Sequence, residues 1–316
     1  MILGFDIGGT KSAVILAEVK GETIDFLGRY EMKTESDWRS VLDELSMKAK
    51  EMISSKGLAN EPLQIGVSCG GPLYAERGLI LSPPNLPGWD EVPVVKYLEE
   101  QFKAKARLQN DADACALAEW KYGAGRGTQH MVFLTFGTGL GAGLILNGKL
   151  YRGADNMAGE AGHIRLTEDG PMGYGKRGSF EGYCSGEGIA QLAKKKAEEE
   201  RKSGRTVSYL KDELENITAK DVALAAENGH EDAKEIFRIS GRYFGRGLAI
   251  IVDLLNPEMI VAGSIYKRSG HLMKEEMMKE LEKEAIIYSR KNLKILPSSL
   301  GEAIGDYGAV AAALGE

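Results

Sequence analysis

The sequence predicts an α/β protein built as two lobes, and three observations support this fold class. At 316 residues the chain exceeds the usual size of a single hydrophobic core. Segments rich in Val, Ile, Leu and Phe alternate with segments whose apolar residues recur at helical spacing. A short motif of strand, glycine turn and strand occurs once in each half of the chain, which favours two lobes over one.

The first half of the chain is expected to begin with three strands joined by tight turns. Strands are expected over 2–7, 12–19, 22–32, 63–69 and 106–109, and helices over about 37–56, over 94–102 and from 111 to near 123. In the helix at 37–56 the apolar residues fall on one face, and Gly57 ends it. The loop SPPNLPGW at 82–89 carries three prolines and cannot be regular structure.

The second half is expected to start with another strand, turn and strand, over 131–136 and 142–146. Asn147-Gly148 then predicts a hairpin turn. Further strands are expected over 258–263 and 293–296, with helices over about 187–202, 231–255 and 272–286 and a closing helix after Gly305.

Composition excludes several classes of protein. A net charge of −6 gives no electrostatic footprint for nucleic acid. No apolar run is long enough to span a bilayer, and the first residues lead directly into a strand without the pattern of a signal peptide. The three cysteines, Cys69, Cys115 and Cys184, are scattered and odd in number, which argues against a disulfide framework. We therefore expect a cytoplasmic protein with neither nucleic-acid nor membrane partners.

The two glycine turns, DIGGTK at 6–11 and GTGLGA at 137–142, are the strongest local motifs. GTGLGA fits the relaxed dinucleotide fingerprint, but that fingerprint requires a helix directly afterwards, and here a strand follows. The Walker motif is absent because no G-K-[ST] ends a phosphate loop. Each turn is therefore expected to be a β-hairpin.

Two such hairpins can bind phosphates. Glycine permits close approach of the backbone and positive φ, and consecutive N–H groups form an anion site. Thr10, Lys11 and Thr138 add side-chain donors, and Asp6, at the end of an apolar strand, suits hydrated Mg²⁺. The alternative is that both are merely tight hairpins and that Asp6 caps its turn.

Six motifs occur in a fixed order along the chain: DIGGTK, SPPNLPGW, NDADA, TFGTGLGAG, GEAGH and LLNPEMIVAGS. Together they resemble the ROK family (repressors, open reading frames, kinases), especially its glucokinase-like members, over nearly the whole chain. Only five residues precede Asp6, which leaves no room for the helix-turn-helix domain of ROK repressors and favours a kinase.

The resemblance implies two ribonuclease-H-like lobes of the actin-like ATPase and hexokinase superfamily, with an interlobe cleft. The expected N-terminal lobe is 1–110, completed by the C-terminal helix at about 303–316, and the expected C-terminal lobe is 111–302. Many relatives also form dimers, so a homodimer is expected by analogy.

The resemblance also implies the site residues and the cofactors, ATP and Mg²⁺. Asp111 matches the catalytic base, and helix capping is the alternative role for Asn110-Asp111. Gly263 resembles the loop on the adenosine side of the site, and an ordinary strand-to-helix turn is its alternative role. The implied sugar-binding residues are Asn110, Asp111, Glu160, His163 and Glu181, with Gly71 and Asn85 in adjoining loops; the implied ATP-binding residues are Asp6, Gly8, Gly9, Thr10, Lys11, Gly137, Thr138, Gly139 and Gly263.

The chain departs from the family at its zinc site. Many relatives carry a histidine followed by C-x-C-G-x-x-G-C, whereas here the three cysteine positions hold Met172, Tyr174 and Ser179. One histidine, His163, cannot supply the four ligands of a structural zinc. We predict no structural zinc, with apolar packing of Met172 and Tyr174 stabilising the loop instead.

The leading functional prediction is an ATP-dependent hexose kinase, most simply converting glucose to glucose 6-phosphate. Kinases of N-acetylmannosamine, N-acetylglucosamine or fructose share the same site residues and stay open as alternatives. A non-catalytic sugar-binding regulator is disfavoured because Asp6, both turns and Asp111 are retained. An actin-like filament former would leave the glutamates and the histidine unexplained.

Overall fold

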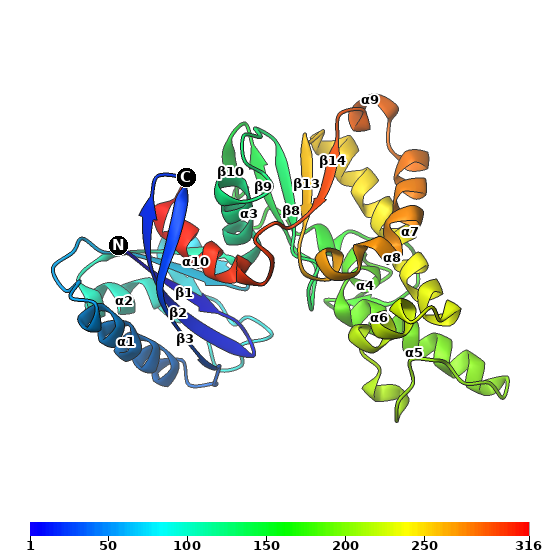
Figure 1. Ribbon diagram of the computed structural model, residues 1–316, viewed down its shortest axis with the longest axis horizontal. Coiled ribbons are helices and arrows are strands. Elements are labelled where there is room, and N and C mark those ends of the chain that lie inside the picture. Colours follow the sequence, from blue (N-terminus) through cyan, green and yellow to red (C-terminus); the bar gives the residue numbers. More distant parts are fainter. Residues whose placement is uncertain (316) are drawn as a thin grey trace. The chain divides into compact units, whose positions relative to one another are not determined.

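The computed structural model describes residues 1–315, and internal contacts divide them into two compact units, drawn in Figure 1. Unit 1 contains Met1–Gln129, Gly143–Ala158 and the C-terminal segment from Ser299, and unit 2 contains His130–Ala142 and Gly159–Ser298. Unit 1 extends beyond residue 110 because α3 (Asp111–Tyr122) packs against the C-terminal helix α10 (Ile304–Leu314).

Unit 1 is built on a five-stranded sheet of order β3-β2-β1-β4-β7. The strands are β1 (Ile2–Ile7), β2 (Lys11–Lys20), β3 (Thr23–Lys33), β4 (Gln64–Cys69) and β7 (Lys105–Asn110). The first three are antiparallel, whereas β1, β4 and β7 run parallel, with Ile7 beside Cys69 and Cys69 beside Asn110. The carboxyl ends of β1, β4 and β7 therefore meet at one edge of the sheet.

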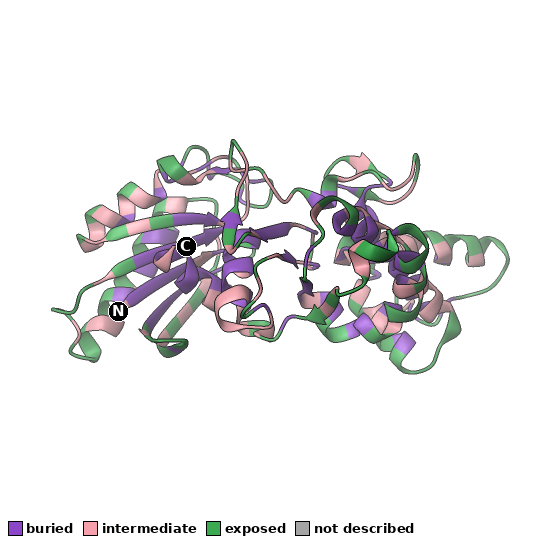
Figure 2. Cartoon of the chain, turned by 90° about the horizontal axis from the view of Figure 1, so that it is seen from above, coloured by how far each residue is buried: buried purple, intermediate pink, exposed green. Residues whose placement is uncertain are grey.

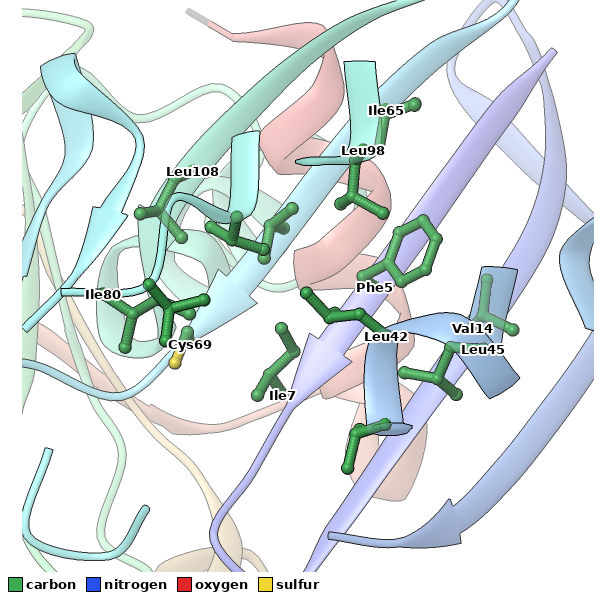
Figure 3. Close-up of a cluster of buried hydrophobic side chains, with 14 of the residues drawn as sticks. Phe5, Ile7, Val14, Leu42, Leu45, Ile65, Cys69, Ile80, Leu98 and Leu108 are labelled. Atoms are coloured by element: carbon green, nitrogen blue, oxygen red, sulfur yellow. The ribbon is translucent and has the colours of Figure 1, made fainter. Parts of the chain in front are cut away.

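The alternation of side chains along the strands divides the core of unit 1 into two layers. Phe5, Ile7 and Val14 point to one face and pack with Leu42 and Leu45 of α1 (Trp38–Ser55), as Figure 3 shows. The helix α2 (Val94–Phe102) covers the same face.

The opposite face of this sheet packs against α10. Ile2 and Ile15 contact the small residues of that helix, Ala309 among them. A Cβ atom placed on Gly66 of β4 would lie 2.1 Å from the Ala309 carbonyl oxygen, so only glycine allows this approach. The last helix of the chain therefore covers one face of the first sheet.

Short elements complete unit 1. β5 (Leu73–Tyr74) pairs with β6 (Leu79–Ile80) around a 3₁₀ turn, η1 (Ala75–Arg77). β9 (Ala142–Leu146) pairs with β10 (Lys149–Tyr151), and positive φ at Asn147 (54°) and Gly148 (68°) confirms the predicted hairpin turn. η4 (Gly301–Ala303) precedes α10.

In unit 2, three strands run parallel in the order β8 (Met131–Leu134), β13 (Met259–Ala262) and β14 (Lys294–Pro297). The longest helices, α7 (Glu231–Leu255) and α8 (Ser264–Glu284), pack closely on each other, with Gly241 and Gly245 against the backbone of Met273 and Met277. The other elements are η2 (Ala161–His163), β11 (Met172–Gly173), β12 (Lys176–Arg177), α4 (Phe180–Tyr183), α5 (Gly186–Lys202), η3 (Leu214–Asn216), α6 (Ala219–Glu227) and α9 (Ile287–Arg290).

The expected helix at 272–286 has the wrong start, since α8 begins at Ser264. Gly270 interrupts the sequence pattern of this helix. In the structure the Tyr266 ring packs against Gly270, and a Cβ atom there would lie 3.1 Å from the ring. Figure 2 shows the buried residues concentrated on the strands and on the inner sides of the helices. Among residues 1–315, no helix has the length and apolar character needed to cross a membrane.

Candidate active site

The first glycine turn joins β1 and β2 and is a β-hairpin, as predicted. The Gly8 N–H donates to the Lys11 carbonyl at 3.0 Å, and the register of the two strands continues from Ile7 and Ser12. Thr34, directly after β3, holds the turn, since its hydroxyl donates to the Gly8 carbonyl at 2.6 Å and its N–H donates to the Thr10 carbonyl at 3.0 Å. Thr10 itself is exposed.

Close approach is what requires glycine in this turn. A Cβ atom on Gly9 would lie 2.4 Å from the Asn85 carbonyl oxygen, so the turn contacts the proline-rich loop directly. Trp89 fixes that loop: its ring is fully buried and its Nε1–H donates to the Glu35 carbonyl at 2.9 Å. The expectation of positive φ at the glycine turns is wrong, because neither Gly8 nor Gly9 has it, nor do the corresponding glycines of the second turn.

Asp6 lies one residue before the end of β1, next to this turn, and its carboxylate is half-buried. A Cβ atom on Gly305 would lie 2.5 Å from Asp6 Oδ2, so the first turn of α10 closes over the carboxylate. Burial, chiefly, raises the pKa of Asp6 to about 6, with further contributions from the charges of Asp306 and Asp111, while Arg29 opposes the rise.

The long basic side chains near Asp6 are engaged with acidic partners. The Arg29 guanidinium donates from Nε to the Asp306 carboxylate at 2.9 Å and from Nη2 to Glu31 at 2.8 Å. Lys11 Nζ donates to Glu31 Oε1 at 2.6 Å and is well exposed. In this structure Lys11 is paired with Glu31. To bind a phosphate, its ammonium group would have to leave this ion pair.

Asn110 and Asp111 stand where β7 gives way to α3. Asn110 is the N-cap, and both Asn110 Oδ1 and Asp111 Oδ1 accept from the Ala112 N–H, at 2.9 and 2.8 Å. The capping alternative therefore holds for Asn110. Its other amide atom, Nδ2, is directed at Gly71 and would lie 3.3 Å from a Cβ there.

Asp111 lies with Asn85 around the glycine that follows β4. A Cβ atom on Gly70 would meet Asn85 Nδ2 at 3.7 Å and Asp111 Oδ2 at 3.8 Å. Asp111 keeps exposed surface, yet desolvation of its carboxylate raises its pKa, while the N–H groups of Ala112 and Asp111 itself lower it. Unit 1 thus brings the predicted Asn85, Asn110 and Asp111 together.

In unit 2 the second glycine turn is likewise a hairpin. The Thr135 N–H donates to the Gly141 carbonyl at 3.0 Å, and the Gly137 N–H donates to the Gly139 carbonyl at 2.9 Å. No helix follows, so the Rossmann interpretation stays excluded. Thr138 is exposed at the tip.

Gly263 lies beside this turn because β8 and β13 are parallel neighbours. The Gly263 N–H donates to the Leu134 carbonyl at 2.9 Å, and the Ile265 N–H donates to the Phe136 carbonyl at 2.9 Å. A Cβ atom on Gly137 would lie 3.6 Å from Ser264 Oγ. Two of the predicted ATP-binding segments therefore meet at the carboxyl ends of the two strands.

The Glu181 side chain and the backbone between Glu160 and His163 also lie against this turn. Glu181 Oε2 accepts from the Leu140 N–H at 2.9 Å, and a Cβ on Gly139 would lie 2.7 Å from the same oxygen. Gly162, between Glu160 and His163, packs so closely that a Cβ there would lie 2.0 Å from the Leu140 carbonyl and 3.2 Å from Glu181 Cβ. Glu160 and His163 are exposed.

The loop after His163 is stabilised by hydrogen bonds and ring packing. Gln191 of α5 accepts from the Met172 N–H and donates to the Met172 carbonyl, both at 2.8 Å. The Tyr174 ring stands edge-on to the His163 ring with centroids 6.0 Å apart, and Lys176 Nζ donates to the His163 carbonyl at 2.8 Å. Met172 thus contributes its backbone. The side chains of Met172 and Tyr174 are 38% and 67% exposed, so the apolar packing expected of them is wrong.

Ser179, at the third cysteine position of the family pattern, is the N-cap of α4, with its hydroxyl accepting from the Gly182 N–H at 3.1 Å. Within the described residues, no three His, Cys, Asp or Glu side chains are grouped so as to hold a metal ion. A single carboxylate such as Asp6 nevertheless suits Mg²⁺, which keeps several waters and takes further oxygens from substrate phosphates.

Sequence patterns did not single out several residues that the structure places at these sites. They are Arg29, Gly70, Gln191, Gly305 and Asp306. Asp306 lies in the first turn of an apolar helix, where an acidic residue is favoured, and this local signal could have identified it. Arg29 and Gln191 act through contacts distant in sequence, which no local pattern reports.

The chain matches the ROK family over residues 2–316. The glucokinase of Halalkalibacterium halodurans is 30% identical over 314 residues, covering 97% of this chain and 92% of the relative. The N-acetylmannosamine kinase of Escherichia coli strain 55989 is 31% identical over 277 residues, covering 87% of each.

Among solved structures, a ROK family glucokinase from Streptomyces griseus in complex with glucose and AMPPNP matches with a TM-score of 0.78 and 29% identity over 99% of both chains. This likeness confirms the predicted fold class, the two-lobed α/β fold of the actin-like ATPase and hexokinase superfamily. The chain belongs to the ROK family, and it is an ATP-dependent sugar kinase of that family.

Proposed function

We propose that this kinase phosphorylates glucose to glucose 6-phosphate, with Asp111 as the catalytic base. The observation that carries the assignment of the base is the position of Asp111: it follows a parallel strand, keeps exposed surface and has a raised pKa. A base works best when its pKa approaches the operating pH, and desolvation moves Asp111 in that direction.

In the proposed reaction, a sugar hydroxyl donates its proton to Asp111 while its oxygen attacks the γ-phosphorus of ATP. The new bond is the phosphate ester, the bond broken joins the γ-phosphorus to the β–γ bridging oxygen, and ADP leaves with that electron pair. Catalysis of this kind depends on positioning and on neutralising charge. Asn110, which caps α3, fixes the backbone from which Asp111 projects.

Phosphate binding is assigned to the two hairpin turns. Gly8, Gly9, Gly137 and Gly139 carry no side chain that could obstruct a phosphate, and Thr10 and Thr138 are exposed donors at the tips. Asp6 would hold Mg²⁺ through water, and the ion would neutralise phosphate charge. Gly263, beside the second turn, is assigned to the adenosine side.

Sugar recognition is assigned to Asn85, Asn110, Glu160, His163 and Glu181, with Gly71 adjoining. Polar side chains that bond adjacent hydroxyls reject sugars lacking them, because the unmatched groups would stay unpaired. Glu181 already has one oxygen committed to the Leu140 N–H, which leaves the other to accept a hydroxyl.

The similarity to an N-acetylmannosamine kinase supports a second candidate substrate, an N-acetylhexosamine. Both sugars would be bound by the same side chains. They differ at C2, where the N-acetyl group of a hexosamine needs more room than the hydroxyl of glucose.

A coupled assay of ADP release over glucose, mannose, fructose, N-acetylglucosamine and N-acetylmannosamine decides between these substrates. We expect the highest kcat/KM with glucose. A higher value with an N-acetylhexosamine would replace glucose by that sugar, and the absence of sugar-dependent ADP release from all five would contradict the assignment of a hexose substrate.

A further inference from the structure

Unit 2 contains a pocket that the kinase reaction leaves unused. It has a volume of about 210 Å³ and lies between α8, α9 and β14. An apolar cavity of roughly 150 Å³ can hold benzene, so this pocket has room for one ring and a small substituent.

The pocket has an apolar wall formed by side chains from α8 and the edge of the sheet. Met277, Met278 and Leu281 line it from the helix, and Leu293 and Ile295 line it from β14 and the residue before that strand. Methionine adapts to irregular apolar ligands because its side chain is unbranched and polarizable. The wall therefore suits a compact hydrocarbon group.

Polar groups without partners border the same pocket. Arg290 Nε is buried and has no hydrogen-bond partner among the described residues. Neither Lys274 nor the Tyr266 hydroxyl makes a hydrogen bond or ion pair in this part of the chain. A buried guanidinium N–H with no acceptor is costly, and a bound anion would satisfy it.

The charges of the lining define the ligand further. Lys274 and Arg290 contribute two positive charges and Glu282 one negative charge, which leaves one positive charge in excess. A monoanion balances this lining, whereas a dianion would be repelled by Glu282. The planar guanidinium matches the geometry of a carboxylate.

The pocket is distinct from the phosphate-binding turn of unit 2. Ile295 pairs with Ile260, near the amino ends of β13 and β14, whereas Gly263 follows the carboxyl end of β13. Along α8, most of the pocket residues lie between Lys274 and Glu282, which at 1.5 Å per residue is about 15 to 27 Å from the first residue of the helix. Among the lining residues, only Tyr266 lies in the first turn of α8, next to Gly263.

We propose that this pocket binds a small organic monocarboxylate with an apolar body. The carboxylate lies against Arg290 and Lys274 and accepts from the Tyr266 hydroxyl, and the apolar body lies on Met277, Leu281 and Ile295. Such a ligand reaches α8, the helix that begins directly after Gly263.

Phenylacetate is a suitable probe, because it joins one ring to one carboxylate. We would measure its binding by calorimetry and by the shifts of ¹³C-labelled methionine methyl groups, with benzyl alcohol and acetate as single-feature controls. We expect phenylacetate to bind and to shift the methyl signals of Met277 and Met278, and both controls to bind at least about tenfold more weakly, as loss of a charged hydrogen bond implies.

Two variants and a matched control test the site. Arg290→Gln should weaken phenylacetate binding about tenfold or more, and Met278→Trp, which fills the pocket, should abolish it. Lys291→Gln, an exposed neighbour outside the pocket, should bind like the wild type. Unchanged unfolding midpoints would show that the variants fold.

The proposal is overturned if phenylacetate fails to bind, if benzyl alcohol binds as well, or if Arg290→Gln binds normally. It is also overturned if ATP displaces phenylacetate competitively, because the pocket would then be part of the nucleotide site. None of these readouts depends on which sugar the kinase uses.

Discussion

At the scale of single residues, Asp6 combines a proposed functional role with a cost to stability. Its pKa rises from 3.8 to about 6, mainly through burial. The folded protein therefore binds this proton more tightly than the unfolded chain, and between about pH 4 and 6 the free energy of unfolding falls as the pH rises. Above that window, Asp6 is an ionised carboxylate in a site that disfavours its charge.

Asp6→Asn should accordingly stabilise the nucleotide-free protein at pH 8. The upper limit of the gain is about 3 kcal/mol, because each pKa unit corresponds to about 1.4 kcal/mol. At pH 4 the gain should vanish, because Asp6 is then protonated in the folded state. Urea unfolding at both pH values measures the difference.

The same substitution should reduce ATP turnover through loss of the proposed Mg²⁺ ligand. An equal or lower free energy of unfolding for Asp6→Asn at pH 8 would contradict the burial argument. Gain of stability without loss of turnover would instead contradict the metal role of Asp6.

At the scale of elements, the hairpin β11–β12 is held by one side chain of α5. Gln191 bonds both backbone groups of Met172, so the hairpin and the helix share an amide bridge. The hairpin follows His163 and precedes Glu181, two of the proposed sugar ligands. The bridge therefore occupies the place in the chain where relatives carry a zinc-bound loop.

Gln191→Ala should raise the KM for sugar more than it lowers kcat, since the loop would lose its position while Asp111 is untouched. The loss of two neutral hydrogen bonds corresponds to about 1–3 kcal/mol. The control is Glu198→Ala, an exposed residue two turns further along α5, which should leave both constants unchanged.

Treatment with EDTA before the assay, followed by excess Mg²⁺, separates this bridge from a zinc site. We expect the wild-type KM for sugar to be unaltered and metal analysis to find no stoichiometric zinc. About one zinc per chain, or a KM raised by EDTA and restored by zinc, would show that the loop depends on a metal.

Most long elements followed from sequence pattern, because their apolar residues repeat with the period of one structure. α2 and α7 have the predicted bounds, and β1 and β4 lie within a residue of them. The sequence pattern did not predict α6, and it placed the start of α8 too late, after Gly270. The contact that accommodates this glycine in the helix, with the Tyr266 ring, is visible only in the structure.

The candidate site shows the same division between local and distant information. Asn110 and Asp111 could be located because a strand leads into a helix there. The contact of Gly9 with Asn85 could not, because it joins segments that are far apart in the chain. Gln191 lies on a charged helix whose sequence predicts only a solvated face.

At the scale of the whole molecule, the first strands of the chain and its last helix pack together in unit 1. α10 lies on β1 and β4, and the approach is so close that a Cβ on Gly66 would meet both the Ala309 carbonyl oxygen at 2.1 Å and the Ala313 nitrogen at 2.4 Å. Backbone atoms cannot move aside as side chains do. We therefore expect the folding of unit 1 to require the last helix.

Gly66→Ala should destabilise the protein by about 1–3 kcal/mol or more, as overpacking of a rigid contact does. Gly28→Ala on β3 is the matched control, since its Cβ would meet the terminal region of the flexible Met52 side chain at 2.7 Å. Equal unfolding midpoints for the two variants would contradict the proposed role of α10.

The central claim is that Asp111 removes the proton from the sugar hydroxyl, and single-turnover phosphoryl transfer tests it most directly. With saturating ATP and sugar, Asp111→Ala should slow transfer by about 10²–10⁴-fold, the usual effect of losing a positioned base. Glu100→Gln, which removes an exposed carboxylate elsewhere in unit 1, should transfer at the wild-type rate. A transfer rate for Asp111→Ala within a few-fold of the wild type would contradict the account.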